Sequence, residues 1–157
     1  MNKLPFANRL AAFIALGQFL EKLPSDADLL AGICDRVSYQ NAWFTPENVK
    51  GAINGMVSLL SAESLENWVG SYPQEPLIHK KVGVVMAGNL PFVGFHDMLC
   101  VLISGHTLQA RFSSTDTVLP MYVIAKLIEI EPLFAERVEI AEQLIKPEAI
   151  IATGGDN

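Results

Sequence analysis

Residues 80–114 read KKVGVVMAGNLPFVGFHDMLCVLISGHTLQARFSS, and this stretch decides the fold. A valine-rich run covers 80–87, a longer apolar run covers 91–104, and a second short run covers 106–112. The lengths of these runs and the glycine turns between them predict a buried strand, an apolar helix and a second strand. A strand, a helix and a strand in this order form a βαβ unit, in which the two strands are parallel.

The rest of the C-terminal half continues this alternation. SSTDT at 113–117 predicts the cap of a helix over 117–130, and weaker strands are predicted over 137–141 and 148–152. A glycine turn follows at 153–155, where a further covering helix would begin, so we expect a chain cut within its domain. Residues 76–157 are therefore predicted to form an α/β domain with a partial, Rossmann-like parallel sheet.

The first 75 residues predict helices alone, and we expect them to form a separate helical segment. Thr45 and Pro46 are a strong helix start, with an N-cap hydroxyl followed by proline in the first turn. Ser64 is predicted to open a short fourth helix, and SYPQEP at 71–76 reads as a linker. The predicted helices span residues 5–22, 26–39, 45–60 and 64–68.

Composition excludes several classes of function. The net charge is −6 and no block of lysine or arginine occurs, which argues against nucleic-acid binding. No apolar run reaches the roughly 18 residues of a membrane span, and the apolar N-terminal run has the pattern of an amphipathic helix instead of a secretion signal. Cys34 and Cys100 are predicted to be reduced, buried thiols of a cytoplasmic protein with no metal site. Because half of the residues are hydrophobic and only 18% are charged, we expect a homo-oligomer or a covering segment that completes the domain.

Three predicted strand ends carry the candidate site, because ligands of open α/β sheets bind at the carboxyl ends of the strands. These ends lie at 87–89, 111–114 and 153–155, and none is a GxGxxG fingerprint. Asn89 stands between Gly88 and Pro91, where its amide would be held as a hydrogen-bond donor. The alternative is that Asn89 only caps a helix that begins at Pro91.

The AGNLP turn, the ARFSS strand end and the ATGG turn, with NAWFT at 41–45, resemble a known family. They are similar to the acyl-CoA reductases related to the bacterial luminescence fatty-acid reductase, within the aldehyde dehydrogenase superfamily. The similarity covers most of the chain and is strongest over 80–114. It implies an enzyme that transfers a fatty acyl group from CoA to a cysteine and reduces the resulting thioester to an aldehyde. Neither Cys34 nor Cys100 matches that nucleophile, so the resemblance implies an N-terminal part that is inactive alone.

The resemblance also implies roles for single residues. Asn89 matches the asparagine that donates to the thioester oxygen, and Arg111 matches a lysine that contacts the adenosine ribose. Ser113 and Ser114 stand where NAD-preferring relatives have a glutamate, which favours NADPH over NADH. An alternative for Arg111 is a solvated residue at a strand end. The remaining cofactor residues implied are Ala87, Gly88, Thr153, Gly154 and Gly155, although 153–155 also reads as a plain strand-to-helix turn.

A rival interpretation is a non-catalytic module that binds a nucleotide or acyl-CoA, or an interaction subunit. His96 and Cys100 lie four positions apart on the predicted apolar helix, but we expect packed core residues there instead of a Cys-His dyad. His79 and His106 are predicted to be isolated.

Overall fold

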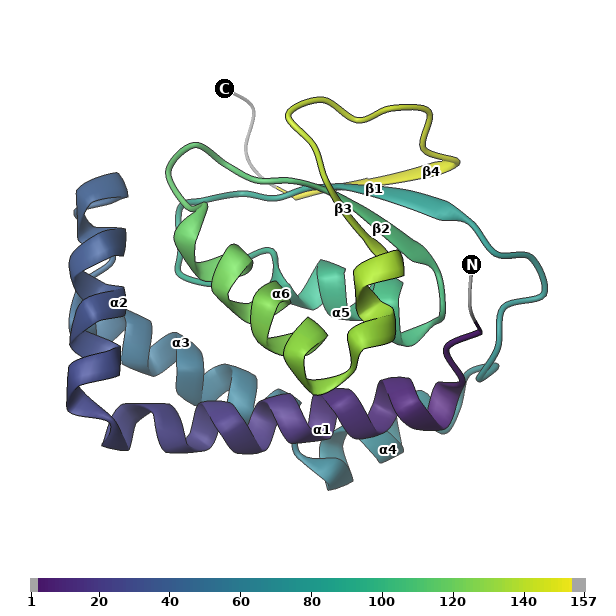
Figure 1. Ribbon diagram of the computed structural model, residues 1–157, viewed down its shortest axis with the longest axis horizontal. Helices are drawn as coiled ribbons and strands as arrows, with labels where there is room; N and C mark the ends of the chain where they lie inside the picture. Colours follow the sequence, from purple (N-terminus) through teal and green to yellow (C-terminus); the bar gives the residue numbers. More distant parts are fainter. Residues whose placement is uncertain (1–2, 154–157) are drawn as a thin grey trace.

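The computed structural model describes residues 3–153 as a helical layer packed beneath an α/β sheet (Figure 1). Residues 1–2 and 154–157 lie outside the described range. The N-terminal elements are α1 (Phe6–Lys22), the short 3-10 helix η1 (Leu23–Ser25), α2 (Ala27–Gln40), α3 (Pro46–Leu59) and α4 (Ala62–Val69). The C-terminal elements are β1 (Lys81–Val85), α5 (Phe95–Ile103), β2 (Thr107–Arg111), α6 (Val118–Ile130), η2 (Pro132–Glu136), β3 (Val138–Ile140) and β4 (Ala149–Ala152).

The four strands form an all-parallel sheet in the order β3-β2-β1-β4. The predicted α/β fold with a parallel sheet is thus confirmed. The chain builds β1, β2 and β3 in one direction and then crosses back to place β4 on the other side of β1. Helices α5 and α6 lie on one face of the sheet, and residues 141–148 cross over the opposite face (Figure 1). The reversal between β1 and β4 is the kind of switch point at which open α/β sheets form a ligand crevice.

Local capping signals account for the helix starts in the N-terminal layer. The Asp26 carboxylate accepts the Leu29 N–H at the start of α2. The Thr45 hydroxyl accepts the Asn48 N–H at the start of α3. The prediction for α4 was wrong by one turn, because Ser61 is the cap and its hydroxyl accepts from the Ser64 N–H.

The helix after β1 also begins later than predicted. Pro91 lies in a turn, and α5 starts at Phe95 with Gly94 as its N-cap. Phe92 takes a left-handed backbone with φ of 59°, which a right-handed helix cannot continue through. Its side chain is buried, so core packing holds a conformation that the sequence pattern does not reveal.

Helix α1 joins the two layers, since it packs on α3 on one side and on α5 and α6 on the other (Figure 1). The rings of Phe13 on α1 and Phe134 on η2 meet edge to face, with centroids 5.7 Å apart. Buried side chains from both layers belong to one core. No helix within residues 3–153 is both long and apolar enough to cross a membrane.

Gly17 sets the approach of α1 to the end of α3. A Cβ atom at this position would lie 2.7 Å from the Leu60 Cβ and 3.1 Å from the Leu60 carbonyl oxygen. We expect Gly17→Ala to lower the free energy of unfolding by about 1–2 kcal/mol, because overpacking against backbone outweighs the gain in helix propensity. Gly32→Ala on α2, where the new methyl group meets no atom within 4 Å, should instead raise it by about 0.5–1 kcal/mol. Urea denaturation of the two variants would test this, and a stabilised Gly17→Ala would contradict it.

Candidate functional site

A cleft of about 860 Å³ lies at the carboxyl edge of the sheet, beside the switch point between β1 and β4. It brings together five of the residues that the sequence predicted, namely Ala87, Gly88, Asn89, Ser113 and Thr153. The predictions missed the opposite wall, which comes from the corner between α2 and α3. The residues of this wall are Gln40, Asn41, Ala42 and Trp43. The predictions also missed Thr115, whose hydroxyl side chain lines the cleft.

The carbonyl group of Gly88 is the anchor of the cleft. It accepts hydrogen bonds from the Asn41 Nδ2 at 2.9 Å and from the Thr115 hydroxyl at 3.1 Å. A Cβ atom on Gly88 would lie 2.5 Å from the hydroxyl oxygens of both Ser113 and Thr115. Only glycine fits here without displacing these hydroxyls, so the end of β1 can approach the end of β2 closely.

Asn89 follows this anchor and is exposed to the cleft. Its side chain makes no hydrogen bond to any residue in the described range. The alternative that Asn89 caps a helix is wrong, because α5 begins at Phe95. The amide is therefore available to donate to a bound ligand.

Arg111 and Ser114 lie in a neighbouring groove of about 720 Å³, and Ser113 lines both cavities. Arg111 is exposed at the end of β2, and no carboxylate within residues 3–153 forms an ion pair with it. Glu142 lines the same groove without an ion pair to Arg111. An exposed guanidinium next to two hydroxyls is a suitable group to receive a phosphate.

Thr153 is held by a partner that the sequence did not indicate. Its hydroxyl donates to the Asp97 carboxylate on α5 at 2.7 Å. This contact ties the end of β4 to the helix that follows β1, across the switch point. The predicted cofactor residues Gly154 and Gly155 lie outside the described residues.

Gln40 fastens the helical corner to α6. Its Oε1 accepts the backbone N–H groups of Thr117 and Val118, at 3.1 and 3.3 Å, and its Nε2 donates to the Thr117 hydroxyl at 2.6 Å. Within the predicted cap SSTDT, Thr117 occupies the N-cap position without a side-chain cap bond, and the Asp116 carboxyl accepts from the Leu119 N–H of the first turn, so Gln40 adds to the predicted cap. No local sequence signal could identify a cap that comes from 77 positions away.

Asp116 follows the cleft residue Thr115 but does not line the cleft, and only 4% of its surface is exposed. Burial raises the pKa of its carboxyl to about 6, although the backbone N–H groups of Leu119 and Phe92 favour the charged form. Its Oδ1 has no hydrogen-bond partner within the described part of the chain. A buried acid with this pKa responds to pH in a range where ordinary carboxyl groups do not.

Neither cysteine lines the cleft, and neither has the features of a nucleophile. Burial raises the pKa of both thiols, whereas a reactive cysteine needs a lowered one. The Cys100 Sγ lies 3.7 Å from the His96 Nδ1, but His96 is exposed, with its ring centroid 5.9 Å from that of Trp68, and Cys100 is only half-buried. The prediction that both are packed core residues was therefore wrong. No group of three or more metal-ligating side chains is found within residues 3–153.

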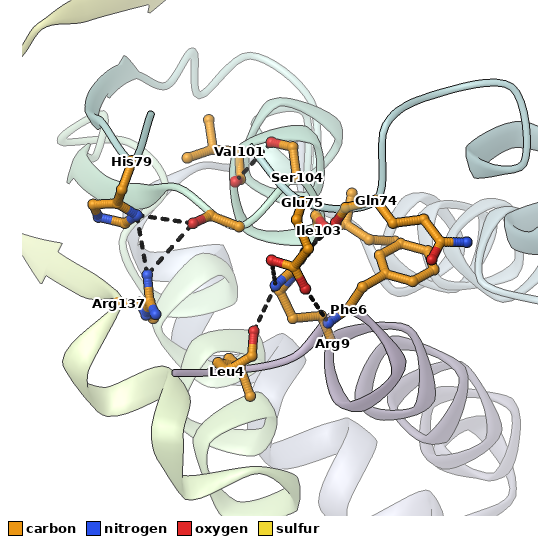
Figure 2. Close-up of polar contacts among 11 residues, drawn as sticks. Leu4, Phe6, Arg9, Gln74, Glu75, His79, Val101, Ile103, Ser104 and Arg137 are labelled. Atoms are coloured by element: carbon orange, nitrogen blue, oxygen red, sulfur yellow. Dashed lines mark hydrogen bonds and ion pairs between the residues drawn. The ribbon is translucent and has the colours of Figure 1, made fainter. Parts of the chain in front are cut away.

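A second polar cluster lies at the other end of the strands (Figure 2). Arg9 is buried, and its guanidinium donates to the carbonyl groups of Leu4, Gln74 and Ile103. His79 contacts Gly105, Thr107 and Arg137 through its ring nitrogens, and the His79 and His106 rings lie 6.1 Å apart. The prediction that these two histidines are isolated was wrong. The contacts join backbone segments, so we regard the cluster as structural.

Comparison with known proteins adds no relative, because no family model and no curated protein matches this chain. Its function has to be inferred from the cleft and from the resemblance of its strand ends.

Proposed function

We propose that this chain is the cofactor-binding and oxyanion-stabilising part of an NADPH-dependent acyl-CoA reductase of the aldehyde dehydrogenase superfamily. The observation that carries the proposal is the position of Asn89. Its amide, which bonds to no residue within 3–153, stands at the switch point of a parallel sheet, in one cleft with Gly88 and Thr153. The overall conversion is acyl-CoA, NADPH and a proton to aldehyde, NADP⁺ and CoA.

The cleft residues fit a bound dinucleotide. Because Gly88 has no side chain, a ligand can approach the backbone at the end of β1. Ser113 lines both the cleft and the groove that contains Arg111, so one ligand could extend from one cavity into the other. Arg111 and Ser114 would hold the ribose phosphate that distinguishes NADPH from NADH. The chemistry that NADPH supplies when bound is a hydride.

Asn89 would act on the acyl group. A thioester carbonyl gains negative charge on its oxygen as it is reduced, and a fixed amide donor stabilises that charge. The contacts on either side hold the backbone of Asn89, because the Gly88 carbonyl is anchored before it and the Phe92 side chain is buried after it. Asn89 is therefore the proposed catalytic residue of this chain.

The acyl-carrying cysteine would come from outside residues 1–157, since Cys34 and Cys100 lie away from the cleft. The same observation favours the second candidate, a module that binds the nucleotide or acyl-CoA without chemistry. Both functions require binding, but only the first makes Asn89 essential for turnover once a nucleophile is supplied.

Cofactor preference provides the test of the proposed site. We expect the chain to bind NADPH about tenfold more tightly than NADH, because a charge-assisted contact with a 2′-phosphate contributes on the order of 1.5 kcal/mol. Arg111→Gln should abolish the difference by weakening NADPH binding alone. Isothermal titration calorimetry measures both affinities.

Arg36→Gln is the matched control, since Arg36 is exposed on α2, outside both cavities. It should leave both affinities unchanged. Equal affinities for the two nucleotides in the unmodified chain would contradict the NADPH assignment. Failure to bind either nucleotide would contradict the proposed function.

A further inference from the structure

The corner between α2 and α3 presents an exposed tryptophan on a fixed backbone. The Trp43 side chain is in the open, with 78% of the residue's surface exposed. Its N–H donates to the Asn41 Oδ1 at 3.0 Å, and its carbonyl accepts from the Asn48 Nδ2 at 2.8 Å. The side chains of Asn41 and Asn48 thus hold the Trp43 backbone at its N–H and at its carbonyl group, and Trp43 lines the cleft.

The same asparagine ties this corner to the proposed catalytic residue. While the Asn41 Oδ1 holds Trp43, the Asn41 Nδ2 donates to the carbonyl of Gly88, directly before Asn89. Gln40 adds its contacts to the start of α6. The backbone of Trp43 is therefore held relative to the backbone of Gly88 before any ligand binds, which lowers the entropic cost of binding.

The two sides of the cleft differ in chemistry. The sheet side carries hydroxyl groups from Ser113, Thr115 and Thr153, and it continues past Ser113 into the groove of Arg111. The large apolar surface on the opposite side comes from Trp43, with Ala42 beside it. A charged dinucleotide suits the sheet side, which leaves the tryptophan side for an apolar ligand group.

We propose that Trp43 forms the wall of a subsite for the acyl chain of the thioester substrate. The inference rests on the proposed function, because it takes the sheet side as the cofactor site. Trp43 would then be a residue that determines specificity for the acyl chain, in addition to the residues that bind the cofactor. Trp43 would contact the first methylene groups beyond the carbonyl that Asn89 polarises.

Tryptophan fluorescence tests the subsite directly. The chain has two tryptophans, and Trp68→Phe leaves Trp43 as the single reporter. We expect octanoyl-CoA to shift the emission of Trp43 to shorter wavelength, whereas free CoA and NADP⁺ leave it unchanged. Calorimetry of the same samples gives the affinity independently of the fluorophore.

Trp43→Ala should weaken the binding of octanoyl-CoA at least tenfold and leave the binding of free CoA unchanged. Tyr39→Ala is the matched control, because Tyr39 is an aromatic residue with 95% exposure at the end of α2 that does not line the cleft. An exposed indole is not part of the core, so circular dichroism should show both variants folded.

The outcomes distinguish failure of the subsite from failure of the proposed function. Full affinity of Trp43→Ala for octanoyl-CoA, with no change in emission on binding, would overturn the subsite and leave the proposed function standing. No calorimetric binding of octanoyl-CoA to the unmodified chain would overturn both.

Discussion

Replacing Arg9 by methionine is expected to lower the free energy of unfolding by about 3–5 kcal/mol, the range for breaking a buried, hydrogen-bonded charge network. The guanidinium holds three segments together, with 2.9 Å to the Ile103 carbonyl and 2.6 Å to the Gln74 carbonyl, besides its bond to Leu4 (Figure 2). Methionine fills a similar volume but leaves these buried carbonyl groups without their donor. Urea denaturation monitored by circular dichroism would measure the loss.

Two further variants separate the causes. Arg36→Met makes the same change on the surface of α2 and should alter stability by less than about 0.5 kcal/mol. Glu75→Gln removes only the ion pair to Arg9, which spans 3.4 Å to a half-exposed carboxylate, and should cost about 1 kcal/mol or less. If Glu75→Gln were as damaging as Arg9→Met, the ion pair and not the backbone contacts would be the main contribution.

Replacing Asp116 by asparagine is expected to remove a pH dependence of stability. Burial raises the pKa of this carboxyl from 3.8 to about 6, so the folded protein binds the proton more tightly than the unfolded chain. The contribution of Asp116 to stability is therefore complete below about pH 4 and is lost as the pH rises through about 6. Two pKa units correspond to about 3 kcal/mol. Between pH 4 and 7, the free energy of unfolding of the unmodified protein should fall by up to about 3 kcal/mol relative to that of Asp116→Asn.

Thermal unfolding of both proteins across this pH range measures the difference. The difference between the two proteins is the informative quantity, because Glu75 and Glu139 are present in both. Their pKa values are lowered in the folded state, so they make stability rise with pH. Asp35→Asn, on the exposed surface of α2, should follow the unmodified protein. A constant offset between the unmodified protein and Asp116→Asn would show that burial does not shift the pKa in this way.

The sequence was sufficient for the order of elements because their signals are local. Apolar runs of strand length, a proline in the first turn of α3 and the cap at Asp26 each act over a few residues. Parallel pairing follows from the alternation of strands with helices, so the common edge that carries Asn89 and Ser113 was also predictable.

The parts that the sequence did not indicate depend on contacts between distant segments. Arg9 is buried against the carbonyl groups of Gln74 and Ile103, which lie 65 and 94 positions away, and its own neighbourhood in the sequence does not indicate these contacts. The late start of α5 depends on the burial of Phe92 in the core, which overrides the helix signal of Pro91. The helical wall of the cleft was missed for the same reason, since Gln40 and Asn41 act on groups 47 to 78 positions away.

The Gln40 contact with α6 also has a consequence for the opening of the cleft. Parallel pairing of β1 with β2 joins residues 26 positions apart, and the corner lies against the sheet through still longer-range contacts, which carry a larger loop-closure cost. Because a few polar contacts of Gln40 and Asn41 join the corner to the sheet side, we expect the cleft to open at a lower free energy than the core unfolds. Any ligand that binds both walls would hold the helical corner against the sheet and so stabilise the closed molecule.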